Sequence, residues 1–371
     1  MKNTSTSLTK LTLQKFKKNG WGVFSFIFLV ICVWVGLFAY VLAPDNSKNA
    51  NQMHLSIHSK PPGFEVKILK IPDAGGNKNS FSEYFTGKKN VAQEIPISDY
   101  TIQNNSLQIR EYSDERGEGI LKDYAISLFP GVKDINKVPE SYITNKTFLL
   151  GTDKYGRDLL SRMLIGIRIS LAIGFVSVFI SLIIGITMGA IAGYFGGKID
   201  AVIMWIINVT WSIPTLLLVI AITLALGKGF WQVFIAVGLT MWVEVARVVR
   251  GQVMSVKQLQ YVNAAKALGY NDFRIITKHI LPNSMAPVII ISAANFAAAI
   301  LIESGLSFLG IGAQPPMPSW GGIIKDHYSY IILGKPFLAI IPGLAIMSLV
   351  TRLLFITCMI PSNELKSKFF D

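Results

Sequence analysis

Charged residues are scarce in this chain of 371 residues. Asp, Glu, Lys and Arg make up 15% of it, whereas a soluble domain of this length carries about 25%. Hydrophobic residues reach 51% and the mean hydropathy is +0.46. The deficit of charge argues against an ordinary soluble protein and indicates one that lies in a lipid bilayer.

Groups that bind metals or carry out catalysis are also few. The two cysteines, Cys32 and Cys358, fall in apolar stretches near opposite ends of the chain, without metal-site spacing. His54 and His58 could share a helical face, but no further ligand is evident. No metal site and no cofactor are therefore expected.

The phosphate-binding pattern GxxxxGK followed by Ser or Thr is missing. The nearest run, "AGYFGGKID", has neither the spacing nor the hydroxyl residue. No paired acids and no nucleophile beside a base stand out either. ATP, if it is used, must be bound by another subunit, and this chain is not expected to be a catalyst.

Long apolar runs are what the sequence has in place of these groups. Trp21–Ala43 is free of charge and long enough to cross a hydrocarbon core of roughly 30 Å. It exceeds the apolar core of a signal peptide, about 7–15 residues, and no cleavage pattern follows. We expect a retained first span. Further spans are expected at Ile169–Phe195, Ala201–Gly227, Gly229–Val249, Ser284–Gly312 and Pro336–Ile360.

The basic residues of the short loops set the orientation. Only Lys228, Lys325 and Lys335 fall on the proposed outer side. Those on the proposed inner side are Lys198, Arg247, Arg250, Lys257, Lys266, Arg274, Lys278, Lys366 and Lys368. The bias predicts cytoplasmic N- and C-termini, and it makes the net charge of +13 a feature of membrane orientation instead of nucleic-acid binding.

Six spans divide the chain into regions. Between the first two lies a long extracytoplasmic insertion with short alternating runs such as "GFEVKILKI" and "NNSLQIREY", which predict a small strand-rich or irregular cap. The expected regions are a cytoplasmic N-terminus 1–20, the first transmembrane helix 21–43, the insertion 44–167, a five-helix core 168–360 with a cytoplasmic loop 250–283, and a cytoplasmic tail 361–371.

The cytoplasmic stretch "NAAKALGYNDFRIITKHILPN" has the pattern of helix, stop, helix. Gly269 suits a left-handed residue at a helix end, Asn271 or Asp272 can cap a second helix, and Pro282 is expected to end it. Its apolar positions could enter the groove of a partner. The alternative, that the pair lies on its own bundle or on lipid headgroups, stays open on periodicity alone.

Several runs resemble one family in order along the chain. The small residues and the turn of the cytoplasmic loop are similar to the "EAA" loop of ATP-binding-cassette importer permeases. Other runs resemble the dipeptide/oligopeptide/nickel branch of that family, and these blocks cover about 148–345. They are "LLGTDKYGRDLLSRMLIGIRISLAIG", "SIPTLLL", "ARVVRGQVMSVKQLQYVNAAKALG" and "ESGLSFLGIGAQPPMPSWGGII".

The resemblance implies an all-α membrane protein of six transmembrane helices. Its core would be a type I, methionine-importer-like permease with one extra N-terminal helix and the extracytoplasmic insertion. In this family the loop docks onto a separate ATPase, so the implied coupling residues are Asn263, Ala264, Ala265, Gly269, Leu281 and Pro282. Asn263 stands where the family usually has glutamate, and "RLLFITCMIPSNELKSKFF" departs from the usual C-terminal ending.

The resemblance also implies partners and a location. They are a homologous second permease, two ATPase subunits, an extracytoplasmic substrate-binding protein and the bilayer of a bacterial cytoplasmic membrane, with no nucleic acid. Peptides are the expected substrates. The binding protein is expected to meet the insertion and the run "GTDKYGRD", whose candidate contacts are Gly151, Thr152, Asp153, Gly156, Arg157 and Asp158.

A few residues inside the spans invite separate interpretations. Gly185, Gly189, Gly193 and Gly197 recur every four residues and predict close approach of another helix. Pro214 predicts a kink, either at a gate or in a packing helix.

Glu303 is an intramembrane acid that should face protein or water. It could line a translocation path, pair at a subunit interface, or lie at the outer end of its span. An alternative function, a secondary transporter that uses Glu303 or Glu244 as a proton site, lacks a visible inverted repeat or relay.

Overall fold

The computed structural model describes residues 16–72, 82–88, 92–103, 106–114, 119–132, 134–227 and 229–359. The predicted tail 361–371, Lys228 and the side chain of Cys358 lie outside this part of the chain. The chain forms two compact units, one of residues 1–32, 170–314 and 345–371 and the other of residues 33–169 and 315–344. Three of the four unit boundaries fall within long helices, α2 (Gly20–Leu37), α6 (Leu159–Phe195) and α14 (Phe337–Met359), and the fourth lies between Gln314 and Pro315.

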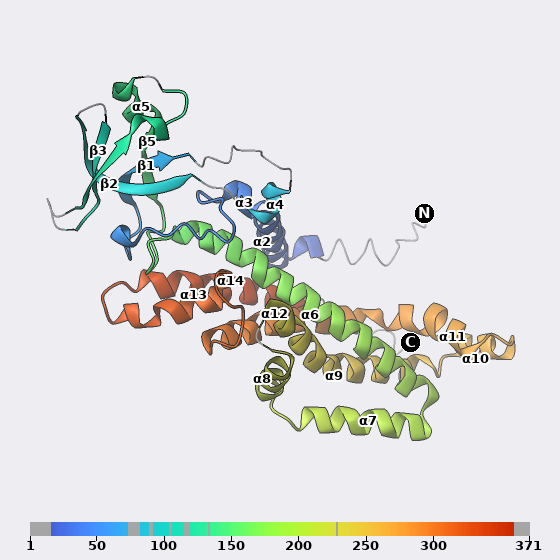
Figure 1. Cartoon of the computed structure of the whole chain (residues 1–371). Coiled ribbons are helices and arrows are strands. Elements are labelled where there is room, and N and C mark those ends of the chain that lie inside the picture. The colour runs from blue at the N-terminus through green and yellow to red at the C-terminus, as the bar shows by residue number, and fades with distance from the viewer. Residues whose placement is uncertain are drawn as a thin grey trace, which may run out of the picture. The chain divides into compact units, whose positions relative to one another are not determined.

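The first unit is helical and centres on α9 (Phe230–Val256), which is buried along most of its length and packs against its neighbours α7, α8 and α12. The unit contains parts of α2, α6 and α14. Its other elements are α7 (Gly197–Trp211), α8 (Thr215–Leu226), α9, α10 (Gln260–Ala267), α11 (Asp272–Ile275), the π-helical turn η4 (Ile276–Ile280) and α12 (Leu281–Phe308) (Figure 1).

Three of the four glycines in the predicted stripe hold α6 close to α9. A methyl group on Gly185, Gly189 or Gly193 would come within 2.5–2.8 Å of an atom of α9. The predicted close approach is therefore confirmed for these three. It is wrong for Gly197, which has a φ of +55° at the start of α7 and open space around it.

Five helices among the described residues are long and apolar enough to cross a membrane. They are Gly20–Leu37, Leu159–Phe195, Phe230–Val256, Asp272–Phe308 and Phe337–Ile356. The expected span Ala201–Gly227, with its predicted kink at Pro214, is formed by α7 and α8, which meet at an angle of 92° (Figure 1). Proline lacks an N–H and its ring obstructs a continuing helix, so the predicted kink becomes a full break.

The second unit contains a five-stranded antiparallel sheet in the order β4-β3-β2-β1-β5. The strands are β1 (Phe64–Ile71), β2 (Gln93–Gln103), β3 (Ser106–Glu111), β4 (Leu121–Ala125) and β5 (Ile143–Phe148). The runs "GFEVKILKI" and "NNSLQIREY" contain β1 and β3, as their alternation predicts. The sheet corrects the description of the fold as all-α. Apolar side chains at alternate positions of a strand point to the same face of the sheet, and that face can be buried.

That face carries a small core. Leu69, Leu107 and Ile109 are fully buried, and Ile97 nearly so. Short helices complete the unit: α3 (Ala39–Leu42), η1 (Leu55–Ile57), α4 (Glu83–Thr86), η2 (Ile126–Leu128), η3 (Ile135–Lys137), α5 (Val138–Tyr142), α13 (Trp320–His327) and η5 (Tyr328–Ile331).

Candidate functional site

The segment between α9 and α12 folds as the predicted helix, stop and helix, with the stop at Gly269. Gly269 has a φ of +77°. Its N–H donates to the carbonyl of Lys266 at 2.9 Å, and the N–H of Tyr270 donates to the carbonyl of Ala265 at 3.2 Å. These two bonds form the Schellman motif that ends many helices on a left-handed residue. Asn271 then caps α11, because its Oδ1 accepts the N–H of Arg274 at 2.9 Å.

Pro282 does not end the second helix. Asp272–Phe308 is one continuous helical stretch of 37 residues, and Pro282 lies in the first turn of α12, directly after the π-helical turn η4. The first turn of a helix tolerates a residue without an N–H, and the wider π turn before it loosens the backbone where the proline ring enters. The prediction of a stop at Pro282 is therefore wrong.

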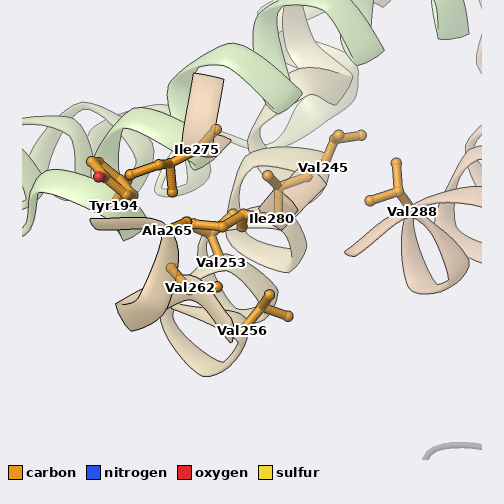
Figure 2. Packing of buried hydrophobic residues seen from close by; sticks show 11 residues of the cluster. Tyr194, Val245, Val253, Val256, Val262, Ala265, Ile275, Ile280 and Val288 are labelled. Atoms are coloured by element: carbon orange, nitrogen blue, oxygen red, sulfur yellow. The ribbon is translucent and has the colours of Figure 1, made fainter. Parts of the chain in front are cut away.

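One face of this segment closes a hydrophobic cluster. Val262 and Ala265 of α10 are buried together with Ile275 and Ile280 of the following helix. Figure 2 shows Val262 and Ala265 gathered with Val253 of α9 and Ile280. The remaining members of the cluster come from α6, α9 and α12: Ala190, Tyr194, Val245, Val249, Val256 and Val288. The turn is thus packed against the helices that frame it.

Polar contacts tie the same segment to α6 and α9. Tyr194 Oη donates to Asp272 Oδ1 at 2.5 Å, and Lys257 Nζ donates to the carbonyl of Tyr194. Lys266 places its ammonium 5.2 Å from the centre of the Tyr194 ring, a cation–π contact worth about 0.5–1 kcal/mol at an exposed site. Lys257, at the end of α9, also lies 5.3 Å from the centre of this ring, so the Tyr194 side chain contacts both helices of the pair and the end of α9.

The other face of the segment is exposed and partly apolar. Leu268 and Phe273, which flank the Gly269 turn, are 73% and 76% exposed. Of the predicted coupling residues, Asn263, Ala264, Gly269 and Pro282 are exposed, Leu281 is half-buried and Ala265 is buried in the cluster. In α10, Val262 and Ala265 therefore face the other helices. Asn263, Ala264 and Lys266 face outward, as does Leu268.

The run "GTDKYGRD" is buried within its own unit. All six candidate contacts, Gly151, Thr152, Asp153, Gly156, Arg157 and Asp158, are buried. Asp153 binds Arg157 Nε at 2.6 Å and accepts the N–H of Tyr155 at 2.8 Å. Arg157 reaches Asn51 Oδ1 at 3.0 Å. These side chains bind the chain itself, whereas Lys154 and Tyr155 of the same run are half-buried.

Glu303 is fully buried within its own chain. Its Oε1 accepts the hydroxyl of Ser307 at 2.6 Å, and the Ser307 oxygen accepts the N–H of Ala313 at 3.1 Å. The carboxylate thus belongs to a hydrogen-bonded network at the end of α12. It lies near that end and away from lipid, as an acid in a membrane span must.

A cavity of about 150 Å³ lies beside the break between α7 and α8. Its wall includes Ile213, the neighbour of Pro214, together with residues of α9 and α12. Glu244 of α9 lines it and is exposed, although both neighbours along the chain are buried. The sequence suggested Glu244 only as a proton site, and the signal that could have singled it out is its place on one face of α9 with Gly251 and Ser255.

Part of the chain matches a known protein family. Residues 185–360, which contain α9 to α12 and the Gly269 turn, match the model of the family described as "Binding-protein-dependent transport system inner membrane component". By its description that family consists of inner-membrane components of binding-protein-dependent transport systems, and the match covers just under half of the chain. The resemblance to binding-protein-dependent importer permeases noted from the sequence is confirmed for residues 185–360.

The chain is similar to several named permeases. It is 42% identical over 197 residues to the glutathione transport system permease protein GsiD of Pectobacterium atrosepticum, covering 53% of this chain and 65% of that protein. It is 42% identical over 184 residues to the dipeptide permease DppC of Bacillus subtilis, covering 50% and 58%. For the oligopeptide permease OppC of Bacillus subtilis the identity is 39% over 182 residues, covering 49% and 60%. The chain thus spans about three fifths of these relatives.

Among solved structures, a chain of the inward-facing MetNI methionine ABC transporter aligns with 54% of this chain and 96% of its own length. Its identity is 18% and its TM-score 0.43.

Proposed function

We propose that this chain is a transmembrane permease subunit of an ATP-driven importer of peptides. It forms half of a translocation path and couples to a separate ATPase through residues 261–282. The proposal is supported by the family of residues 185–360 and by relatives that are named for dipeptide, oligopeptide and glutathione transport.

The observation that carries the coupling role is the pair Leu268 and Phe273. Both are exposed on either side of a turn whose inner face is packed against the chain. Exposed apolar residues on a short, well-supported helix pair are suited to the hydrophobic groove of a partner. Lys266 and Arg274 beside them supply charge for the rim of such a contact.

The packing explains how movement of the ATPase would reach the membrane. A partner that pulls on Leu268 and Phe273 pulls on Val262, Ala265 and Ile275, which are buried among side chains of α6 and α9. Close-packed side chains transmit displacement because they leave little empty space to absorb it. ATP binding by the partner would thereby shift α9 and α12 and change access to the path.

The assembly would contain this chain, a homologous permease, two ATPase subunits and an extracytoplasmic binding protein. In this proposal the chain crosses a bacterial cytoplasmic membrane six times, with both termini in the cytoplasm and a type I, methionine-importer-like core. The regions are 1–20, 21–43, 44–167, 168–360 and 361–371, with the sheet in the third of these. Because the candidate contacts in "GTDKYGRD" are buried, the binding protein would meet the insertion and the accessible parts of Lys154 and Tyr155.

The test is reconstitution of the whole complex in proteoliposomes. We expect ATP-dependent uptake of short peptides, and we expect Leu268→Asp with Phe273→Asp to abolish uptake and ATPase retention, since charge replaces the apolar contact. Lys278→Ala, a change at an exposed residue further along the same segment, is the control and should leave both intact. Normal uptake by the double variant would overturn the coupling role.

A further inference from the structure

Glu244 lies in the middle of α9, and its carboxylate is not covered by the chain. Val243 and Val245 on either side of it are buried, whereas Glu244 is exposed. Gly251 and Ser255, seven and eleven residues further on, are exposed too. These intervals return to the same side of a helix. Glu244, Gly251 and Ser255 therefore form a small and polar strip along one face of α9.

The cavity next to Glu244 presents hydrogen-bond acceptors. Besides Glu244, three threonines line it: Thr210, Thr215 and Thr240. Two of their hydroxyls donate the proton to a carbonyl one turn earlier, Thr210 to Ile206 and Thr240 to Val237, both at 2.9 Å. Their free lone pairs can accept. The rest of the wall is mainly apolar, so the recess suits a small cation attached to an uncharged body.

The nearest basic side chain along α9 is held elsewhere. Arg247 stacks its guanidinium 3.7 Å from the centre of the Trp211 ring and donates to Asn208 Oδ1 at 2.6 Å. Within the described residues, no Lys or Arg nitrogen lies within 4.0 Å of the Glu244 carboxylate. An acid inside a span is costly unless it faces water or a counter-charge, and the exposed Glu244 carboxylate is open to both from outside the chain.

A metal ion fits the recess poorly. The described residues contain no group of three His, Cys, Asp or Glu side chains that could hold one. One carboxylate and three threonine hydroxyls do not provide the nitrogen or sulfur ligands that select transition metals. An ammonium group needs only acceptors, and a carboxylate flanked by hydroxyl oxygens supplies them.

We propose that Glu244 and the adjoining cavity bind the α-ammonium group of a peptide as it crosses the membrane. The inference rests on the proposed function. The α-ammonium is common to peptides of any side-chain sequence, so one acid could serve many substrates. Glu244 is then a specificity-determining residue for the charge at the peptide N-terminus.

The test compares trialanine with N-acetyl-trialanine in proteoliposomes that hold the whole complex, with the binding protein saturated by each peptide. We expect Glu244→Gln to reduce uptake of trialanine about tenfold, as loss of a hydrogen bond between charged groups predicts. Uptake of the acetylated peptide should stay unchanged. Glu244→Asp keeps the charge and should retain the preference for trialanine.

Each other outcome has a definite meaning. Equal loss for both peptides, or no loss for either, would overturn the inference. If Glu244→Gln instead released the second permease during purification, the carboxylate would belong to a subunit interface, and the inference would again fail. If the wild-type complex showed no ATP-dependent uptake of either peptide, the proposed function itself would fail.

Discussion

Tyr194 and Asp272 lie 78 residues apart in the chain, and the hydroxyl of the first donates to the carboxylate of the second at 2.5 Å. The bond joins the last turn of α6 to the first residue of α11. The backbone carbonyl of Tyr194 also accepts a hydrogen bond from Lys257 Nζ. The Gly269 turn is therefore fixed to α6 by a polar contact as well as by the hydrophobic cluster.

Tyr194→Phe removes this bond and keeps the ring in the cluster. A hydrogen bond to a charged group is worth about 1.5–3 kcal/mol, and the exposure of Asp272 places the loss at the lower end. We expect the complex to assemble normally but to show a smaller ratio of substrate-stimulated to basal ATP hydrolysis. An unchanged ratio would show that the tether has no part in coupling.

The contact between α6 and α9 should not tolerate larger side chains. A Cβ at Gly189 would lie 2.5 Å from the carbonyl oxygen of Ala246, which cannot move without the helix. Overpacking of this kind costs about 1–3 kcal/mol. Gly189→Ala should therefore lower the midpoint of thermal unfolding in detergent.

The control for this change is Gly343→Ala. Gly343 lies inside α14 with no atom within 4 Å of an added Cβ. Alanine is favoured over glycine inside a helix by roughly 0.5–1 kcal/mol, so this variant should be as stable as the wild type or more so. Equal destabilisation by both variants would contradict the close approach at Gly189.

Asp153→Asn tests whether "GTDKYGRD" is chiefly structural. Asp153 is fully buried and pairs with Arg157 at 2.6 Å and Arg162 at 3.6 Å. Removing one charge from a buried pair costs about 3–5 kcal/mol, because the other is left uncompensated. We expect a large loss of thermal stability in the full chain.

Lys154→Ala in the same run should change stability much less, since its pair with Asp326 is partly exposed and such pairs contribute about 0–1 kcal/mol. If Asp153→Asn were as stable as the wild type and bound the binding protein more weakly, the run would be a direct contact surface.

Glu94 makes the stability of the insertion depend on pH in the acidic range. Burial favours a higher pKa for its carboxyl, but the contact with His54 and the charges of Lys146 and Lys70 outweigh burial and lower the pKa from 4.5 to about 2. A lowered pKa stabilises the fold above the unfolded value. The contribution is on the order of 3 kcal/mol, and it is lost as the pH falls from 4.5 toward 2.

The measurement compares thermal unfolding of the full chain with that of the Glu94→Gln variant at pH values between 2 and 6. The wild type should be the more stable protein at pH 6, and the difference should shrink below pH 4.5. A difference independent of pH would show that the carboxylate is not responsible.

Local patterns predicted local features well. Gly269 followed by Asn271 indicates a helix end and a new cap, and alternation in "GFEVKILKI" indicates β1. The continuous helix past Pro282 was not predictable, because the π turn that admits the proline has no residue signature. Burial of "GTDKYGRD" depends on Asn51 and Ser59, about a hundred residues earlier in the chain. No local pattern reports a partner at that separation.

The exposed position of Glu244 illustrates the same limit. Its spacing from Gly251 and Ser255 defines a face of α9, but only the packing of α6, α7, α8 and α12 decides which face stays uncovered. Glu303, an acid in a similar apolar setting, is fully buried and accepts a hydrogen bond from the Ser307 hydroxyl. Two acids with similar surroundings in the sequence thus have opposite environments in the fold.

The coupling role of the Gly269 turn is the central claim, and the shape of the turn offers its most direct test. Gly269 has a φ of +77° with open space around it, so a side chain there meets strain and no clash. A β-branched residue resists this conformation most, while Asn adopts it with less strain. Asn263→Glu, which restores the family's usual residue at an exposed site, should be tolerated alongside.

The decisive measurement is ATPase retention and substrate-stimulated ATP hydrolysis of the assembled complex, with Gly269→Val compared with Gly269→Asn. The account predicts that Gly269→Val loses both while Gly269→Asn keeps most of each. If a correctly folded Gly269→Val complex retains its ATPase and full stimulation, residues 261–282 are not the coupling element.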